Sequence, residues 1–248
     1  MKSRYALLIL VLCTAAPASA EDLVSGLSQD VVEITSNYTG TDIVVFGAIE
    51  RPAEMQGRDV VVVVRGPDVD MTVRRKDRVA GIWINHDRAV LGGMPSYYFL
   101  ASTRPMSEIA SPDTLKRYDL GLADVEPQRV ASHHDVEPFR LAAVRQEVKS
   151  GLYAEAPSGV VFLSETLFRV HVPVPASVPR GQYNVAVYLF RDGTVISAQS
   201  TPLFIDQTGF ERRLLNVAHQ SPFTYGFSTV LAAALLGWLS SLAFRRSD

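Results

Sequence analysis

The feature that most constrains this chain is an uncharged apolar stretch near its C-terminus, Phe223 to Phe244. About 20 such residues are enough to cross the hydrocarbon core of a bilayer as a helix. Aromatic residues lie near both ends of the stretch, and Arg245 and Arg246 follow at once, which is typical of an inside-facing stop. The sequence therefore predicts a transmembrane helix over residues 223–244, preceded by a short juxtamembrane helix over 209–222 and followed by a cytoplasmic tail over 245–248.

Small residues recur every four positions in the predicted span and would share one face of the helix: Thr229, Ala233, Gly237 and Ser241. Such stripes let helices approach closely in lipid, although small residues are also common in membrane helices that only anchor. The stripe is therefore a candidate transmembrane packing face, and a plain anchor is the alternative.

The opposite end of the chain predicts export. A basic start precedes an apolar run, and Ala18-Ser19-Ala20 closes the segment with small residues, which indicates a secretory signal peptide over residues 1–20. The only cysteine, Cys13, lies inside this segment, so the mature chain has none for a disulfide, a thiolate metal site or a nucleophile. We expect the body, residues 21–208, on the outer side of the membrane.

Charge argues against nucleic acid as a partner. The whole chain has a formal net charge of −2, and the part between the signal peptide and the tail carries −5, because the two ends together hold four basic residues and one acidic residue. A nucleic-acid-binding domain is usually basic. We therefore predict no nucleic-acid partner.

The body is predicted to be mainly β. Val60 to Val64 is apolar on both faces and predicts a central strand that is covered on both sides. Asp192-Gly193, between two alternating runs, predicts a two-residue hairpin turn. Pro179-x-Gly181-x-Tyr183 is similar to the corner at which a tyrosine ties down a late strand of immunoglobulin-like sandwiches. With at least seven candidate strands, these signals favour an immunoglobulin-like β-sandwich.

Residues 86–157 differ from the rest and predict a helical insertion on one edge of the sandwich. Ser111-Pro112 is a helix start, and Gly121 is its expected end. A second helix is expected from Pro138 to Ser150. Its apolar face would carry Leu141, Val144 and Val148.

A concentrated basic run follows the central strand: Arg65, Arg74, Arg75, Lys76 and Arg78. The pattern predicts two strands with Lys76-Asp77-Arg78 at the turn between them. One interpretation is a charged edge strand, which prevents sheets from pairing edge to edge. The other is a patch that docks a small anion or an acidic partner surface, because the planar fork of arginine suits bidentate contacts.

Sequence motifs for catalysis are absent, including the nucleophile elbow, the dinucleotide and phosphate loops and the zinc-protease helix. His86-Asp87 could join Asp113 and a serine such as Ser96 in a triad only if the fold brought them together. The one histidine cluster is His133-His134. We therefore expect a non-enzyme without cofactor or metal, and a metal-dependent hydrolase around these histidines is the weakest hypothesis.

Several stretches together resemble a family of alphaproteobacterial transmembrane proteins of unknown function. They are YTGTDIVVFGAIE, VVVVVRGP, VRRKDRVAGIWIN, PSYYFLASTRP, AVYLFRDG, TGFERRLLNVAHQSPFTYG and GWLSSLAFRR. The resemblance covers nearly the whole mature chain. It implies a periplasmic body on an inner-membrane anchor, with a sulfite-exporter-like permease as a candidate partner, and it carries over no functional residues.

The leading hypothesis from sequence is thus a membrane-anchored periplasmic accessory protein that docks on another envelope protein. The alternative is a periplasmic module that binds or senses a small anion.

Overall fold

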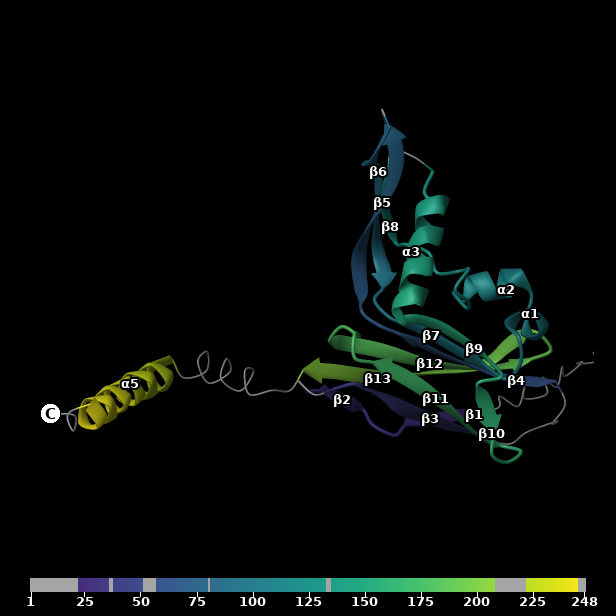
Figure 1. Ribbon diagram of the computed structural model, residues 1–248. Helices are drawn as coiled ribbons and strands as arrows, with labels where there is room; N and C mark the ends of the chain where they lie inside the picture. The colour runs from purple at the N-terminus through teal and green to yellow at the C-terminus, as the bar shows by residue number, and fades with distance from the viewer. Residues whose placement is uncertain are drawn as a thin grey trace, which may run out of the picture.

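The computed structural model describes residues 22–35, 38–50, 57–79, 81–132, 135–207 and 222–244. Within these residues the chain is mainly β, with three sheets and a layer of helices (Figure 1). The predicted mainly β class is confirmed. The expected signal peptide, the tail and residues 209–221 of the expected juxtamembrane helix lie outside the described residues.

Two of the sheets pack face to face. Sheet A has the strand order β1 (Asp22–Leu27), β3 (Gly40–Glu50), β11 (Leu167–Pro175) and β10 (Val160–Phe162). Sheet B has the order β2 (Val31–Ile34), β13 (Thr194–Gln207), β12 (Gly181–Arg191), β4 (Arg58–Arg65), β7 (Tyr98–Ser102) and β9 (Tyr153–Pro157). Neighbours are antiparallel except for two pairs, β2 with β13 and β7 with β9, which are parallel.

Strand β4 lies between two hydrophobic cores. Val60, Val62 and Val64 belong to the core between sheets A and B, whereas Val61 and Val63 belong to a second core on the opposite face of sheet B. Successive side chains of a strand point to opposite faces, so five valines in a row fill both cores. The prediction of a strand covered on both sides is confirmed.

Two turn predictions are also confirmed. Asp192 and Gly193 have φ values of 47° and 81°, and Arg191 pairs with Thr194 across them, as a two-residue turn with two left-handed residues requires. The hydroxyl of Tyr183 donates a hydrogen bond to the carbonyl oxygen of Pro179, four residues earlier. This bond fixes the corner at which the chain enters β12.

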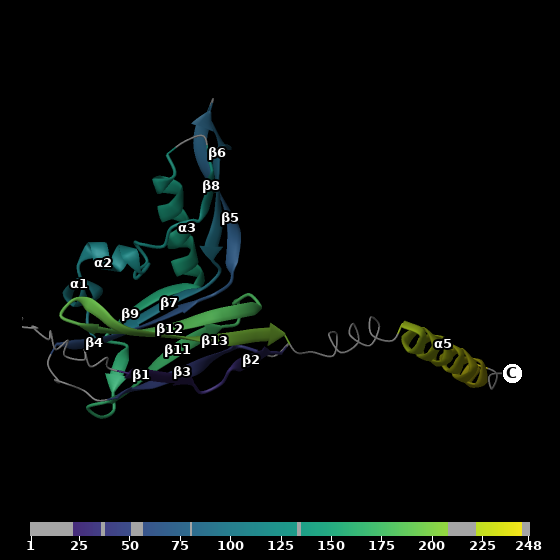
Figure 2. The ribbon, with the colours of Figure 1, turned by 180° about the vertical axis from the view of Figure 1, so that it is seen from behind.

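The second core is covered by a third sheet and by helices. Sheet C has the order β5 (Asp68–Val79), β6 (Ile82–Pro95) and β8 (Arg129–Ala131). The helices are α1 (Met106–Ile109), α2 (Pro112–Arg117) and α3 (Glu137–Ser150). Figures 1 and 2 show these elements on the side of sheet B that faces away from sheet A.

The expected insertion is therefore wrong in two respects. Residues 86–95, 98–102, 129–131 and 153–157 are strand, and the segment both forms one edge of sheet B, through β7 and β9, and covers a face of it. The reason is burial, since Leu91, Met94 and Leu100 are at most 1% exposed and pack in the second core. A short apolar run of this kind fits a buried strand as well as a buried helix.

The two predicted helices, α2 and α3, begin where the sequence predicts. The Ser111 side chain accepts a hydrogen bond from the backbone N–H of Thr114, but α2 ends at Arg117, before Gly121. Helix α3 ends at Gly151, whose φ of 76° is left-handed. Of its expected apolar face, Val144 is buried as predicted, whereas Leu141 and Val148 are 45% and 44% exposed. The buried side chains are Phe139, Arg140, Ala143 and Val144.

The last described element is α5 (Pro222–Phe244), a helix of 23 residues that stands apart from the sheets in both views (Figures 1 and 2). Its bounds agree with the predicted span to within one residue. Among the described residues, no helix combines the length and the apolar character that a membrane crossing needs.

Candidate functional site

The basic run does not form one patch. Arg65 ends β4 in sheet B, whereas Arg74, Arg75, Lys76 and Arg78 lie on β5 in sheet C. The chain runs about 20 Å along β5 between Asp68 and Arg74, at about 3.3 Å per residue. The expected patch therefore divides into two sites, which we describe separately.

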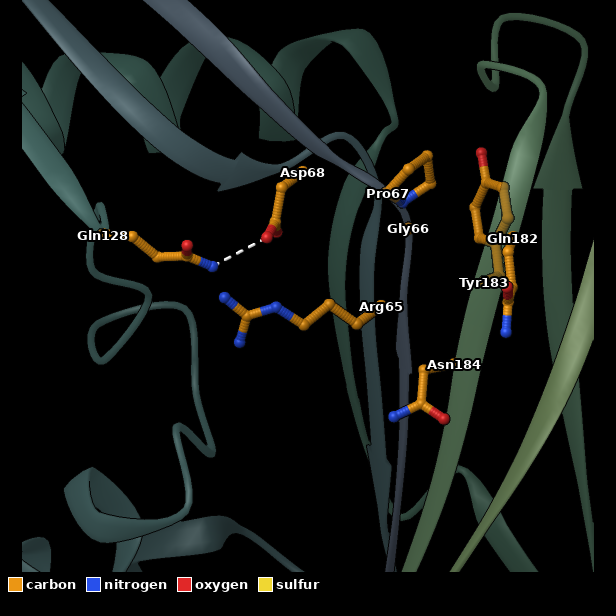
Figure 3. A pocket seen from close by; sticks show the side chains of 8 residues that line it. All are labelled: Arg65, Gly66, Pro67, Asp68, Gln128, Gln182, Tyr183 and Asn184. Carbon is orange, nitrogen blue, oxygen red and sulfur yellow. Dashed lines mark hydrogen bonds between the residues drawn. The ribbon is translucent and has the colours of Figure 1, made fainter.

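The first site is a hollow of about 340 Å³ beside Arg65, at the end of β4 (Figure 3). It is lined by Arg65, Gly66, Pro67, Asp68, Gln128, Gln182, Tyr183 and Asn184. The Arg65 side chain extends toward Gln128, whose amide donates to a carboxylate oxygen of Asp68 over 2.7 Å. Burial raises the pKa of the Tyr183 phenol to about 12, so this ring stays neutral.

The charge in this hollow is mixed. A guanidinium nitrogen of Arg65 lies 3.7 Å from a carboxylate oxygen of Asp119, and Asp68 lines the same hollow. The remaining polar side chains are three amides and the neutral phenol of Tyr183. Arg65 is therefore the one cation among the lining residues, beside three amide side chains that can donate hydrogen bonds.

The second site is the β5–β6 hairpin. Strand β8 pairs only with residues 90–92 of β6, so the far part of the hairpin is two-stranded and projects from the body (Figures 1 and 2). Lys76, Asp77 and Arg78 were expected at the turn, but they pair with Asn85, Ile84 and Trp83 within the ladder. The turn lies beyond them at Gly81, whose φ of 86° is a conformation that glycine adopts readily. The predicted turn position was therefore wrong.

Arg75 holds the base of the projecting part. Its guanidinium bonds to the carboxylate of Asp87, whose side chain is only 4% exposed. The Nε atom of the same guanidinium lies 3.7 Å from a carboxylate oxygen of Asp77. The same guanidinium sits over the ring of Phe139 on α3, 5.9 Å from its centre. These contacts tie the hairpin to α3, so Arg75 has a structural role.

Arg74 lies in different surroundings. It is directly opposite Arg88 in the ladder, and both side chains are exposed. Neither has an ion pair or a hydrogen bond within the described part of the chain. Together with Asn85, His86 and Asp87 they line a hollow of about 210 Å³. The ladder register shifts between Arg75 and Lys76, which leaves His86 as an extra residue on β6.

The tip of the hairpin is apolar. Ile82 and Trp83 are each 66% exposed, and Ile84 is 42% exposed. The sequence pattern predicts a strand here, but the exposed apolar tip was not predicted. The signal was present in the sequence, because three large apolar side chains beside a turn cannot all face a core.

The same hairpin holds a cluster of possible metal ligands. One ligand atom each from Asp77, His86 and Asp87 lies within 4.8 Å of the others. Both carboxylates already contact the guanidinium of Arg75, so a metal ion would have to displace it. His133 and His134, the other histidines of the metal hypothesis, lie outside the described residues.

A serine triad is not assembled. His86 is on the projecting part of β6, and Ser96 follows the other end of that strand, ten residues away and about 30 Å along it. Both Ser96 and Ser102 are buried.

The outer face of sheet A carries an apolar surface. Four apolar side chains from four strands share this face: Val24 on β1, Phe46 on β3, Leu167 on β11 and Val161 on β10. Val24 and Leu167 both lie opposite Ala48, and Arg169 lies opposite both Phe46 and Val161. The exposed fractions of Val24, Phe46, Val161 and Leu167 are 51%, 45%, 48% and 38%. An antiparallel sheet that faces water normally carries polar side chains there. We call the surface formed by Val24, Phe46, Val161 and Leu167 the sheet A face.

Helix α5 exposes apolar side chains around its whole circumference. Eight of these side chains are more than half exposed: Phe223, Phe227, Val230, Leu231, Leu235, Leu236, Trp238 and Leu239. The small residues Thr229, Ala233, Gly237 and Ser241 are also exposed on this helix.

The fold and these surfaces define a mainly β protein with several sheets, a projecting hairpin and a separate apolar helix. The chain belongs to a known protein family. The family described as "Putative transmembrane protein (Alph_Pro_TM)" matches residues 22–246, as the resemblance in sequence predicted. A search of the curated proteins found no match.

Proposed function

We propose that this protein is a non-enzymatic accessory protein of the inner membrane, anchored by one C-terminal helix, with its body in the periplasm and its tail in the cytoplasm. The family description supports a membrane location. Residues 223–244 carry no charge, and a helix of 23 residues is about 35 Å long, which matches a bilayer core of about 30 Å.

We propose further that the body is an immunoglobulin-like sandwich. Its β1-β3-β11-β10 order corresponds to the ABED sheet of that fold, and β13-β12-β4 corresponds to the GFC sheet. The Tyr183–Pro179 bond lies at the start of β12, where the tyrosine corner of such domains is found. In this assignment, the β5–β6 hairpin is an addition between two strands of sheet B.

The observation that carries the docking function is the sheet A face. Four large apolar side chains are exposed on the outer face of sheet A, where Arg169 lies between Phe46 and Val161. Apolar patches of this kind on exported domains commonly mark protein interfaces. We propose that this face docks on an integral membrane protein, for which a sulfite-exporter-like permease is the candidate.

A photocrosslinking amino acid tests this proposal directly. It is placed at Phe46, on the sheet A face, or at Leu141, on the outer side of α3. Both positions are 45% exposed, so they form a matched pair. Irradiation of cells should give a discrete crosslinked product from position 46 and none from position 141. Equal products from both positions, or free monomer only from position 46, would contradict the docking proposal.

The second candidate function is the binding of a small anion in the Arg65 hollow. The observation that favours it is that Arg65 lines one concavity with three amide side chains, Gln128, Gln182 and Asn184. Titration of the full chain in detergent with sulfite, sulfate or phosphate should raise the melting temperature, and Arg65→Gln should abolish the shift. No shift at millimolar anion would remove this candidate.

A further inference from the structure

The β5–β6 hairpin has an apolar tip, formed by Ile82, Trp83 and Ile84, and also a local excess of positive charge. Residues 74–88 carry five basic and two acidic side chains, a net charge of +3, although the exported part of the chain carries −5. The surface that this hairpin contacts should therefore be both negative and able to accept apolar side chains.

The Arg74–Arg88 pair makes the charge argument specific. Like charges placed directly opposite each other destabilise an antiparallel ladder. The pair lines the same small hollow as Asn85, His86 and Asp87, and neither arginine has an ion pair within the described residues. An anion between the two guanidinium groups would relieve the repulsion and could receive bidentate hydrogen bonds.

The tip supplies the second half of the argument. Trp83 lies opposite Arg78, so an indole ring and a cation share one level of the ladder. Tryptophan beside arginine or lysine is typical of the boundary between headgroups and acyl chains. Ile82 and Ile84 precede and follow Trp83 in β6, so they give the opposite face of the tip an exposed apolar surface.

From these contacts we infer that the β5–β6 hairpin binds the surface of a bilayer rich in anionic phospholipid. A lipid phosphate lies between Arg74 and Arg88, and Trp83 enters the acyl boundary. This contact goes beyond the proposed protein docking, uses a different surface, and rests on the proposed membrane anchor.

The geometry sets the angle of approach. Ile82 and Arg88 are six residues apart on β6, a length of about 20 Å. The headgroup layer is thinner than this. The hairpin therefore lies obliquely on the membrane, with Lys76 and Arg78 between the tip and the arginine pair at the level of the headgroups.

Trp83 itself reports the contact. The sequence has two tryptophans, so Trp238→Phe leaves Trp83 as the only one. The full chain carrying this change is placed in nanodiscs of phosphatidylcholine, with or without phosphatidylglycerol. Lipids brominated on their acyl chains should quench Trp83 strongly in the anionic discs and weakly in the neutral discs. High salt should reduce the quenching.

Two arginine variants provide the matched comparison. Arg74→Gln/Arg88→Gln should lower the affinity of the hairpin for the anionic surface about fivefold per arginine. Arg117→Gln/Arg145→Gln removes the same charge from exposed helix positions and should leave quenching unchanged. A melting temperature unchanged by either pair shows that both variants are folded.

Three other outcomes would each overturn the proposed contact between the hairpin and anionic lipid. Equal exposure of Trp83 to an aqueous quencher in both kinds of disc excludes an anionic lipid contact. Protection of Trp83 in cell membranes but not in lipid discs indicates a protein partner for the hairpin. A melting shift with inorganic phosphate that needs Arg74 and Arg88, without quenching by lipid, indicates a free anion.

Failure of the lipid contact can be told apart from failure of the proposed docking function and of the proposed anchor. Crosslinking from position 46 does not depend on Trp83, and recovery of the chain with the discs tests the anchor alone. If the chain does not enter the discs, the anchor is wrong. The hairpin is then tested by flotation with vesicles of the same two compositions, where equal binding of both would overturn the inference.

Discussion

The guanidinium of Arg75 bonds to the buried carboxylate of Asp87 across the β5–β6 ladder. One residue earlier in the same strand, Arg74 lies opposite another arginine, Arg88. Adjacent residues of one basic run thus have different roles, because alternate side chains of a strand point to opposite faces.

This difference predicts opposite results for two conservative changes. Arg75→Gln should lower the free energy of unfolding by about 1–2 kcal/mol, because Asp87 loses a cationic partner in a buried position; the half-exposed arginine keeps the loss below that of a fully buried pair. Arg74→Gln should leave stability unchanged or raise it slightly, because it removes a like-charge contact. Urea unfolding of the full chain in detergent measures both, and a larger loss from the change at position 74 would contradict the assignment.

The tyrosine corner gives a second prediction. Tyr183→Phe should cost about 1–2 kcal/mol of unfolding free energy, because it removes the hydroxyl that donates to Pro179 and leaves a carbonyl oxygen without that donor. Tyr188→Phe on the same strand is the control, since its hydroxyl makes no hydrogen bond within the described residues. Thermal melts of the two variants should differ. Similar midpoints would show that the corner bond contributes little.

A third prediction concerns Gly47 in β3. A Cβ atom at this position would lie 2.9 Å from the carbonyl oxygen of Val24 and would overlap the ring of Phe168. Gly47→Ala should therefore destabilise the sandwich by about 2 kcal/mol or more, as overpacking of a core does. Gly81→Ala is the comparison, because its Cβ would meet no atom within 4 Å and only its φ of 86° is strained. Chemical denaturation should rank the change at Gly47 as the more severe.

The fourth prediction is loss of stability in alkali. Burial raises the pKa values of Tyr97, Tyr98 and Tyr153 above the ordinary 10.0, and that of Tyr183 to about 12. The folded state therefore holds protons that the unfolded state releases near pH 10. Stability should be full below pH 10 and should fall as pH rises from 10 through 12. Tyrosinate absorbance should appear together with unfolding, and ionisation of all nine tyrosines near pH 10 in the folded protein would contradict this.

Much of the β architecture could be predicted from local patterns. The valine run of β4, the Asp192-Gly193 turn and the corner at Tyr183 each depend on neighbouring residues, and each is confirmed. The segment after residue 86 was misjudged, because a short apolar run has the same composition in a buried strand as in a buried helix. The expected face of α3 was only partly right because Arg140 fills a core position. Its guanidinium nitrogens donate to Glu137 and to the carbonyl oxygens of Ala123 and Val125.

The sequence by itself determined the family, the β class and the position of the apolar C-terminal helix, since these depend on composition, periodicity and run length. Only the tertiary structure decided which arginine is structural and which is free, because strand register and packing against Phe139 separate Arg75 from Arg74. It also decided that Arg65 lies in a separate hollow and that Ile82, Trp83 and Ile84 form an exposed tip. Charge and hydrophobicity are properties of residues, whereas a site depends on which residues the fold brings to the same face.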